Sequence, residues 1–302
     1  MNVLVTGSSG LVGSALGPLL SSNGHQVIRL LRSKPYAGEA RRFWDPEAGT
    51  LDSGALEGLD AVVNLAGENI AGRWTDAKKA KILNSRVKST RLLSVALSRL
   101  ARPPKVLVSA SASGFYGDRG DQLLTEESAS GSMFLSEVCR QWEAATKPAA
   151  QAGIRVVVLR IGVVLSAGGG ALARMLTPFK LGAGGRMGSG RQFWSWIALD
   201  DLLGATLHAL NTPALHGPVN AVAPHPVTNL EFAKILGRVL KRPTLLPMPA
   251  FAARLAFGQM AKELLLASAR MEPARLLATG YKFQYCGLEP ALRHLLGKDA
   301  PA

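Results

Sequence analysis

The chain opens with NVLVTGSSGLVGSAL (2–16), and this stretch decides the fold class. A short apolar segment runs into three glycines, Gly7, Gly10 and Gly13, with the spacing GxxGxxG. A turn without Cβ atoms lets backbone come close to a pyrophosphate, and the helix after it offers free N–H groups and the positive end of its dipole. The stretch therefore predicts a strand, a phosphate-binding turn and a helix.

The residues beyond the glycines supply the context that such a turn needs. The predicted helix ends near residues 23–24 and contains Pro18, which is expected to bend it. Four further apolar segments are typical of buried strands separated by amphipathic helices. These are QVIRLL (26–31), DAVVNLAG (60–67), KVLVSASASGFYG (105–117) and IRVVVLRIGVVL (154–165). We expect an α/β fold built on a doubly wound parallel sheet.

The end of the second predicted strand indicates which dinucleotide fits. An NAD binder usually places an Asp or Glu there for the ribose 2′-hydroxyl. This chain has no acidic residue before Glu39 and carries Arg32, Ser33 and Lys34 at that point. A guanidinium holds a 2′-phosphate by a bidentate contact, whereas a carboxylate would repel it. NADP(H) is therefore favoured, although an arginine merely exposed at a strand end would give the same pattern.

A cation lies on the apolar side of a long predicted helix, roughly 75–100. The inward stripe of this helix contains Ile82, Leu93, Leu97 and Leu100, and Arg86 falls within it. A cation there needs a partner, and a dinucleotide phosphate or ribose lies in the expected direction. A side chain that reaches out to solvent, or one that pairs with a protein carboxylate, is the other interpretation.

Length and composition indicate a soluble globular protein. The chain has 302 residues, of which 47% are apolar and 19% charged, enough for about two domains. The first charged side chain is Arg29, so no cationic segment precedes the first apolar run as it would in a signal peptide. The longest uncharged run, 202–230, contains three His and four Pro. We expect a cytoplasmic protein that does not associate with membranes.

Net charge and cysteine usage bear on partners and metals. The net charge is +14, but the basic residues are dispersed, with KKAK (78–81) the densest group. We expect a solvated basic surface and no nucleic-acid partner. The two cysteines, Cys139 and Cys286, and five scattered His give neither a disulfide framework nor metal-ligand spacing. No metal site is expected.

Seven segments together resemble one known family. They are TGSSGLVG (6–13), NLAGENI (64–70), NSRVKST (84–90), SASASGFYG (109–117), LRIGVVLSAGGGAL (159–172), GSGRQFWSWIALDDL (188–202) and the tail from LPMPAFAARLAFGQ onward. The set is similar to the extended short-chain dehydrogenase/reductases, specifically their atypical branch of epimerase-family proteins. The resemblance implies a Rossmann-type domain at 1–240, with 164–200 contributing to the substrate cleft. A smaller C-terminal helical domain of unknown function, which would complete the cleft, follows at 241–302.

The resemblance also implies an NADP(H) site. The candidate cofactor contacts are Gly7, Ser9, Gly10, Leu11, Val12, Gly13, Arg32, Ser33, Leu65, Ala66, Gly67, Arg86, Ser109 and Cys139. The family's catalytic serine corresponds to Ser111, if one extra residue is allowed before Tyr116.

Two other catalytic positions depart from the family. Its members use a Tyr and a Lys in YxxxK, and counting back from Glu143 places Leu135 and Cys139 at these positions. Leucine cannot transfer a proton. A cysteine in mid-helix has neither a local cation nor a helix N-terminus to activate it. A packing or ribose-contact role for Cys139 is therefore favoured over a chemical one.

The missing proton donor needs a replacement. Tyr116 is the leading candidate, because its phenol is expected at the mouth of the cleft after the Ser111 loop. Glu68 and Ser113 are weaker candidates. Two hypotheses remain: an NADP(H)-dependent oxidoreductase or epimerase acting on an unidentified small molecule, which we favour, and a non-catalytic NADP(H)-binding sensor or scaffold.

The segment GRMGSGRQFWSWIALDD (185–201) is expected to form a cleft wall. It combines Arg191 with Phe193, Trp194 and Trp196, a cluster suited to an anionic or ring-bearing ligand, although the tryptophans could instead pack a domain junction. The acidic pair at 200–201 is expected to cap the helix that follows. Apolar faces of the tail helices could cover the cleft or form a homodimer.

Overall fold

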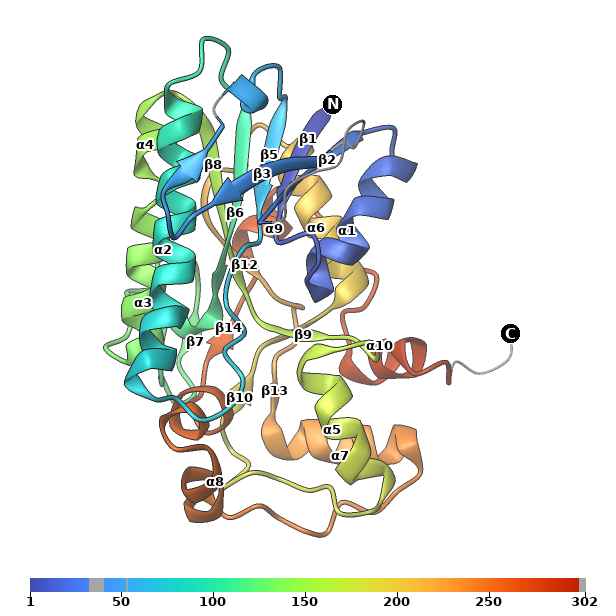
Figure 1. Ribbon diagram of the computed structural model, residues 1–302. Coiled ribbons are helices and arrows are strands. Elements are labelled where there is room, and N and C mark those ends of the chain that lie inside the picture. Colours follow the sequence, from blue (N-terminus) through green and yellow to red (C-terminus); the bar gives the residue numbers. More distant parts are fainter. Residues whose placement is uncertain (33–40, 53, 299–302) are drawn as a thin grey trace.

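The computed structural model describes residues 1–32, 41–52 and 54–298. Figure 1 shows two parts, a large parallel sheet flanked by helices and a smaller assembly of helices and short strands at one end of it. The order of the eight strands in the sheet is β12-β8-β6-β5-β1-β2-β3-β4. All neighbours are parallel except β3 and β4. The predicted doubly wound α/β fold is confirmed.

Five strands of the sheet, β1, β2, β5, β6 and β8, lie within the predicted segments, whereas β3, β4 and β12 were not predicted. Their bounds are β1 (Asn2–Thr6), β2 (Gln26–Leu31), β3 (Arg41–Asp45), β4 (Thr50–Leu51), β5 (Ala61–Asn64), β6 (Val106–Ala112), β8 (Arg155–Ile161) and β12 (Gly217–Ala221). In β1, Val3 and Val5 enter one hydrophobic cluster and Leu4 enters another, because alternate side chains point to opposite faces. Both faces are therefore buried, as continuous apolar strands require.

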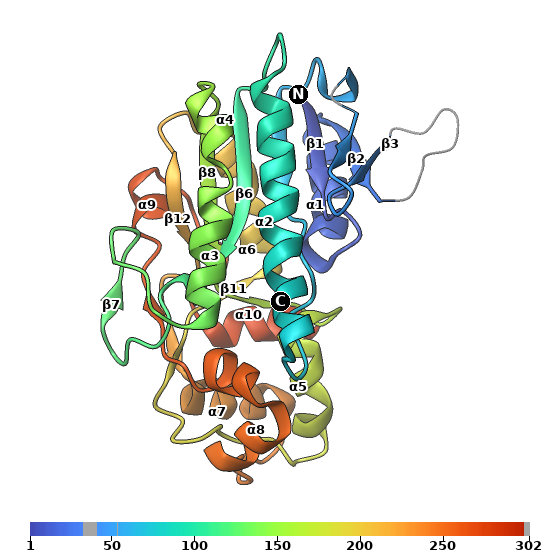
Figure 2. The same cartoon turned by 60° about the vertical axis from the view of Figure 1, so that its left-hand side comes forward.

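Helices cover both faces of the sheet. On one face lie α1 (Leu11–Ser22) and α6 (Leu199–Asn211). On the other lie α2 (Asp76–Ser98), α3 (Phe134–Ala144) and α4 (Lys147–Gln151). Figure 2 shows the face that these three helices cover. The long helix predicted at 75–100 is thus confirmed, and the Thr75 side chain caps it by accepting a hydrogen bond from the Lys78 N–H at 3.2 Å.

The smaller part packs around a second core. Its elements are β9 (Val163–Leu165), α5 (Gly170–Lys180), β10 (Phe193–Trp194), β11 (Trp196–Ala198), β13 (Val227–Thr228), α7 (Asn229–Leu240) and α10 (Leu288–Leu295). Remaining elements are the short helices η1 (Gly54–Leu56) and η2 (Ser113–Phe115), α8 (Ala250–Phe257), the π-helical turn η3 (Ala261–Leu265), α9 (Ala274–Ala278), and the paired β7 (Leu123–Leu124) and β14 (Arg270–Met271).

The C-terminal segment is fastened to both parts. Leu276 joins the core between the sheet and α1, whereas Leu288 and Leu292 join the core of α5 and α7. Met260 packs with Ile82 of α2. The domain boundary at residue 240 stays a prediction. A homodimer also stays a prediction. An apolar side chain on α8, Phe251, is 74% exposed.

The prediction that Asp200 and Asp201 cap α6 is wrong. The residue at the N-cap is Ala198, and it makes no side-chain hydrogen bond there. Asp201 is fully buried and instead accepts hydrogen bonds from the backbone N–H groups of Gln284 and Tyr285, at 2.7 and 3.0 Å. The carboxylate thus holds the C-terminal segment against α6, and burial raises its pKa.

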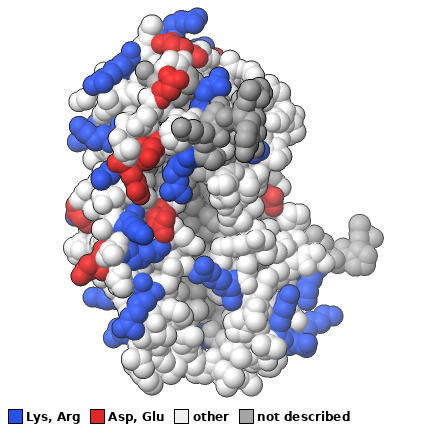
Figure 3. Space-filling view, in the orientation of Figure 1, with Lys and Arg blue, Asp and Glu red and all other residues white. Residues whose placement is uncertain are grey.

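Charge is spread over the surface. In the view of Figure 3, Lys and Arg side chains are dispersed, and acidic ones lie among them. Within the described ranges, no helix is long and apolar enough to cross a membrane. In the same part of the chain, no group of three or more His, Cys, Asp or Glu is placed to hold a metal ion.

Candidate functional site

The glycine turn is shaped by close backbone packing. Gly7 has φ +66°, and a Cβ on it would lie 2.6 Å from the carbonyl oxygen of Leu65. A Cβ on Gly13 would lie 2.3 Å from the carbonyl oxygen of Gly7. Only glycine fits both positions. The helix after the turn has no side-chain cap and no acidic residue in its first turn, so its N-terminus favours an anion.

A buried hydrogen-bond network fixes the strand ends beneath this turn. Asn64 accepts a hydrogen bond from the Thr6 hydroxyl at 2.7 Å and donates to Thr90 at 2.8 Å and Ser109 at 3.2 Å. The Thr6 hydroxyl also accepts from the N–H groups of residues 65 and 66. Ser109 is completely buried. Its side chain therefore serves to hold Asn64, and its contact with a cofactor stays a prediction.

The end of β2 presents a cation. Arg32 is exposed there, next to the glycine turn, and Ser33 lies outside the described residues. Glu68 accepts a hydrogen bond from the Lys78 ammonium at 2.6 Å, and this bond lowers the pKa of its carboxyl group. An ionised, cation-bound carboxylate is a poor proton donor at neutral pH, which argues against Glu68 as an acid.

Arg86 lies behind the loop that follows β5. Its guanidinium donates to the carbonyl oxygens of Ile82 and Glu68, at 3.1 and 3.0 Å, and lies 5.1 Å from the centre of the Trp142 ring. Burial lowers its pKa. It forms no ion pair with a described carboxylate, so the interpretation of a protein ion pair loses support. A Cβ on Gly67 would lie 3.1 Å from this guanidinium, which keeps the loop and the cation in contact.

Ser111 belongs to a buried polar cluster. Its hydroxyl donates to the Glu143 carboxylate at 2.7 Å. Arg160 grips the same carboxylate through two hydrogen bonds of 3.0 Å, and its guanidinium carbon lies 3.5 Å from the centre of the Phe115 ring. Burial lowers the pKa of Arg160, but the hydrogen bonds and charge of Glu143 outweigh it, and the net shift is upward. A catalytic role of Ser111 stays a prediction, with its hydroxyl hydrogen committed to Glu143.

The expected position of Tyr116 at the cleft mouth is wrong. Its side chain is completely buried, and the hydroxyl lies 2.7 Å from the Asn220 side-chain oxygen and accepts from Arg160 at 3.0 Å. Burial raises the pKa of the phenol. The short helix η2 turns the chain after β6, so that Tyr116 points into the protein while Ser113, three residues earlier, remains at the cavity wall. Tyr116 cannot reach a substrate without rearrangement.

Leu135 and Cys139 lie on the first turns of α3, facing β6 and η2. The Cys139 thiol donates weakly to the carbonyl oxygen of Ala112 at 3.7 Å and is almost fully buried. Burial, together with the charge of Glu143, raises the pKa of this thiol to about 11. The thiol is therefore neutral at physiological pH, which favours the packing interpretation of Cys139 over a chemical role.

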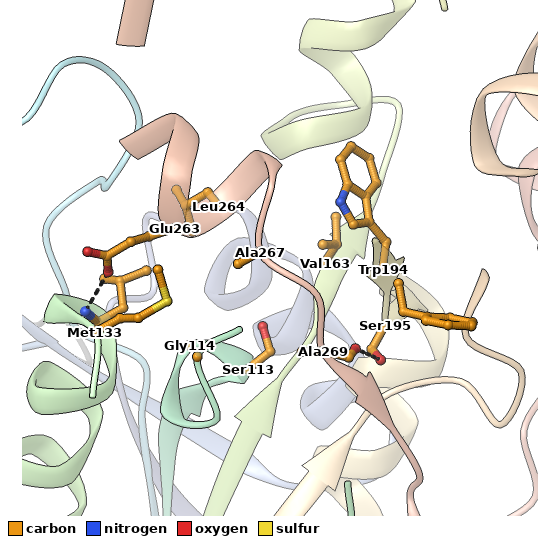
Figure 4. Close-up of a pocket in the computed structure, with 13 residues that line it drawn as sticks. Ser113, Gly114, Met133, Val163, Trp194, Ser195, Glu263, Leu264, Ala267 and Ala269 are labelled. Carbon is orange, nitrogen blue, oxygen red and sulfur yellow. Dashed lines mark hydrogen bonds between the residues drawn. The ribbon is translucent and has the colours of Figure 1, made fainter. Parts of the chain in front are cut away.

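A cavity of about 80 Å³ lies beside Leu135, between the sheet and the C-terminal segment. Ser113, Leu135, Phe193, Trp194 and Glu263 are among the residues that line it. Figure 4 shows the Ser113 hydroxyl and the Trp194 indole nitrogen facing this space.

The predicted cleft wall divides between cavity and core. Trp194 lines the cavity, whereas Trp196 is completely buried and donates to the carbonyl oxygen of His225 at 3.1 Å. The expectation that one tryptophan packs a junction thus describes Trp196. Arg191 is exposed and does not line the cavity. The expectation of an anionic ligand, which depended on this cation, therefore loses support.

Glu263 joins the C-terminal segment to α3. Its carboxylate accepts hydrogen bonds from the backbone N–H groups of Phe134 and Leu135, at 3.3 and 2.8 Å. The N-cap residue of α3, Met133, makes no side-chain hydrogen bond, so Glu263 supplies the cap from a distant part of the chain. The dashed line from Glu263 in Figure 4 marks its bond to Leu135.

Three functional positions escaped the sequence reasoning. Glu143 served only to align the YxxxK segment, and the tail gave no sign of Glu263. Arg160 did carry a signal, since it is a cation in the middle of the apolar strand 154–165. The reasoning that singled out Arg86 would have found it.

The fold and the site define a dinucleotide-binding protein of the Rossmann class. Residues 3–222 match the model of the NAD dependent epimerase/dehydratase family, and residues 248–295 match a domain of unknown function, DUF1731. The chain belongs to the NAD-dependent epimerase/dehydratase family.

Three relatives show the range of similarity. Epimerase family protein Mb2239 of Mycobacterium bovis is 45% identical over 291 residues, 96% of each chain. The crystal structure of human epimerase family protein SDR39U1 (isoform 2) with NADPH has a TM-score of 0.91 at 39% identity, covering 98% of this chain and 99% of that one. A nucleoside-diphosphate sugar epimerase from Corynebacterium glutamicum has a TM-score of 0.83 at 42% identity, covering 98% of this chain and 58% of that one.

Proposed function

We propose that the protein is an atypical extended short-chain dehydrogenase/reductase that binds NADPH and reduces a small acceptor molecule. The observation that carries the cofactor part is the turn in which a Cβ at Gly7 or Gly13 would strike backbone, set before an uncapped helix N-terminus. Arg32, exposed at the end of β2, is placed to favour the 2′-phosphate. The human relative crystallised with NADPH supports the same assignment.

Replacing Arg32 tests the choice of cofactor. Arg32→Ala is expected to weaken NADPH binding about tenfold, because a hydrogen bond to a charged group contributes about 1.5 kcal/mol or more. NADH binding should change little, since NADH lacks the phosphate. Calorimetric titration measures both affinities. Arg102→Ala, exposed in the loop before β6, is the control and should leave both unchanged. Equal losses for NADPH and NADH would refute the role of Arg32.

The residues around the cavity favour reduction over epimerisation. When bound, NADPH supplies a hydride. Epimerisation through a keto intermediate begins with removal of a proton from a substrate hydroxyl, which needs a general base, but Leu135 stands at the position of the family's Tyr, and Tyr116 is buried. Among the described residues that line the cavity, Glu263 alone is ionisable, and its carboxylate binds the start of α3. Hydride transfer to a carbonyl carbon would leave an alkoxide that takes up one proton from solvent water, and the Ser113 hydroxyl is left to donate a hydrogen bond to this oxygen.

Replacing Ser113 tests the chemical part. NADPH-loaded enzyme that turns over a small aldehyde or ketone is expected to lose up to about tenfold in kcat/KM on Ser113→Ala, the size of one neutral hydrogen bond. Loss of NADPH absorbance measures the rate. Ser22→Ala, at the exposed end of α1, should be unaffected. An unchanged rate in Ser113→Ala would remove this serine from the chemistry.

A second candidate function is a non-catalytic NADPH-binding sensor or scaffold. Two observations favour it: Leu135 cannot transfer a proton, and the Cys139 thiol stays neutral because its pKa is raised to about 11. A sensor would bind NADPH with normal affinity and consume none with any aldehyde or ketone offered. Substrate-dependent oxidation of NADPH would exclude it.

A further inference from the structure

Among the described residues, one fully buried indole N–H lacks a partner. Trp194 is only 6% exposed, and its Nε1 is buried without a hydrogen bond to any described residue. By contrast, Trp74 donates to the carbonyl oxygen of Ile70 at 2.7 Å, and Trp142 donates to Thr90 at 3.0 Å. A buried donor left unpaired is costly, and native proteins leave few of them.

The unpaired donor faces the cavity beside Leu135. Trp194 is held there by β10, which pairs with β13, and its ring packs against Phe232 with centres 5.3 Å apart. The Ser113 hydroxyl faces the same space from η2 (Figure 4). Two hydrogen-bond donors from separate elements therefore converge on one small volume, where an acceptor oxygen would satisfy both.

The remaining wall of the cavity is mainly apolar. Leu135, Val163, Phe193 and Leu264 contribute to it. No described Lys, Arg or His lines the cavity, and its one charged residue, Glu263, is an anion. A phosphate or carboxylate placed here would lose its hydration and meet a negative charge without a compensating cation. The lining thus selects against anionic ligands.

The volume of the cavity also argues against a large anionic ligand. At about 80 Å³, the cavity is well below the range of about 300–1,000 Å³ typical of pockets for drug-sized ligands. A nucleoside-diphosphate sugar is both too large and too highly charged. A molecule of a few carbon atoms with one carbonyl group matches the size, the apolar wall and the two donors.

We propose that this cavity binds a small, uncharged, mainly apolar carbonyl compound, whose oxygen accepts hydrogen bonds from the Trp194 indole and the Ser113 hydroxyl. The proposal rests on the function proposed above and names its substrate class. It sets this chain apart from the sugar-nucleotide chemistry in the name of the Corynebacterium relative.

The test follows the indole N–H signals of ¹⁵N-labelled protein by NMR. The protein is loaded with NADP⁺, so that cyclohexanone, the probe, cannot be reduced. Trp194→Phe identifies the Trp194 signal by its disappearance. Titration with cyclohexanone is expected to move this signal downfield in a saturable way, as an indole that gains an acceptor should respond. UDP-glucose at the same concentrations should leave it in place.

Affinity gives a second readout that does not depend on the indole signal. The methyl signals of Val163 report cyclohexanone binding in the wild type and in the variants. Trp194→Phe keeps an aromatic ring and removes one donor, so it should weaken binding about three- to tenfold. Trp74→Phe, which removes a satisfied indole outside the cavity, should leave the affinity unchanged.

Three results would overturn the proposal. They are a Trp194 signal that ignores cyclohexanone, a saturable response to UDP-glucose, or a signal that moves with NADP⁺ alone and no further with cyclohexanone. The last would make the nicotinamide amide the acceptor. Failure of the cofactor proposal is distinguishable, because it would appear first as absence of NADP⁺ binding in calorimetry.

Discussion

Gly13→Ala is expected to weaken NADPH binding at least about 100-fold. The new Cβ would lie 2.3 Å from the carbonyl oxygen of Gly7 and 2.7 Å from the Cα of Ser8. Both are backbone atoms, so the turn itself must move, and the N–H groups at the start of α1 move with it. Loss of two hydrogen bonds to a charged pyrophosphate, at about 1.5 kcal/mol each, weakens binding about 100-fold. Calorimetric titration with NADPH measures the loss.

A second glycine in the same helix provides the matched control. A Cβ on Gly17 would meet only the end of the Arg29 side chain, at 3.8 Å, which is ordinary van der Waals contact. Gly17→Ala should therefore keep wild-type affinity and increase stability by up to about 1 kcal/mol, because alanine favours the helix. Circular dichroism confirms that both variants are folded. Tight NADPH binding by folded Gly13→Ala would show that the turn is not the pyrophosphate site.

Arg160→Met is expected to lower the free energy of unfolding by about 3–5 kcal/mol. The side chains of Arg160 and Glu143 are only 5% and 16% exposed, so the variant leaves a carboxylate buried without its cation. The Tyr116 hydroxyl also loses the hydrogen bond that it accepts from Arg160. Urea denaturation followed by tryptophan fluorescence measures the change.

Two further variants test whether the instability comes from the unpaired Glu143 carboxylate or merely from loss of the Arg160 side chain. Arg160→Met combined with Glu143→Gln removes the isolated charge and should recover at least half of the stability. Arg293→Met breaks an exposed helical pair with Glu289 and should change stability by no more than about 0.5 kcal/mol. If the double variant is as unstable as Arg160→Met alone, the buried charge is not the cause.

The sheet and the glycine turn could be predicted because their signals are local. Five strands of the sheet, β1, β2, β5, β6 and β8, are short apolar runs, and three glycines at fixed spacing mark the turn. The strands β3, β4 and β12 lack this pattern and were not predicted. The helix around Arg86 was equally accessible, since the 3.6-residue period of Ile82, Leu93 and Leu97 fixes its buried face. Such periodicity reports which side of an element is inside, and that suffices for the architecture.

The site was harder to predict because its partners are distant in sequence. Tyr116 was expected at the cleft mouth, but the turn of η2 after β6 sends it into the core and leaves Ser113 at the wall. Asp201 resembles a cap in sequence, yet its hydrogen-bond donors lie more than 80 residues later, at 284 and 285. Trp194 and Trp196 are two positions apart and have opposite roles, which only the surroundings of each indole decide.

The cap that Glu263 places on α3 makes the tail part of the cooperative folding unit. The bond spans 128 positions of sequence and ends on the helix that carries Leu135 and Cys139. A chain that ends before this glutamate would leave the backbone N–H groups of Phe134 and Leu135 without an acceptor next to the cavity, and the helix would fray from that end. The first turn of this helix therefore depends on an acceptor that the tail must supply.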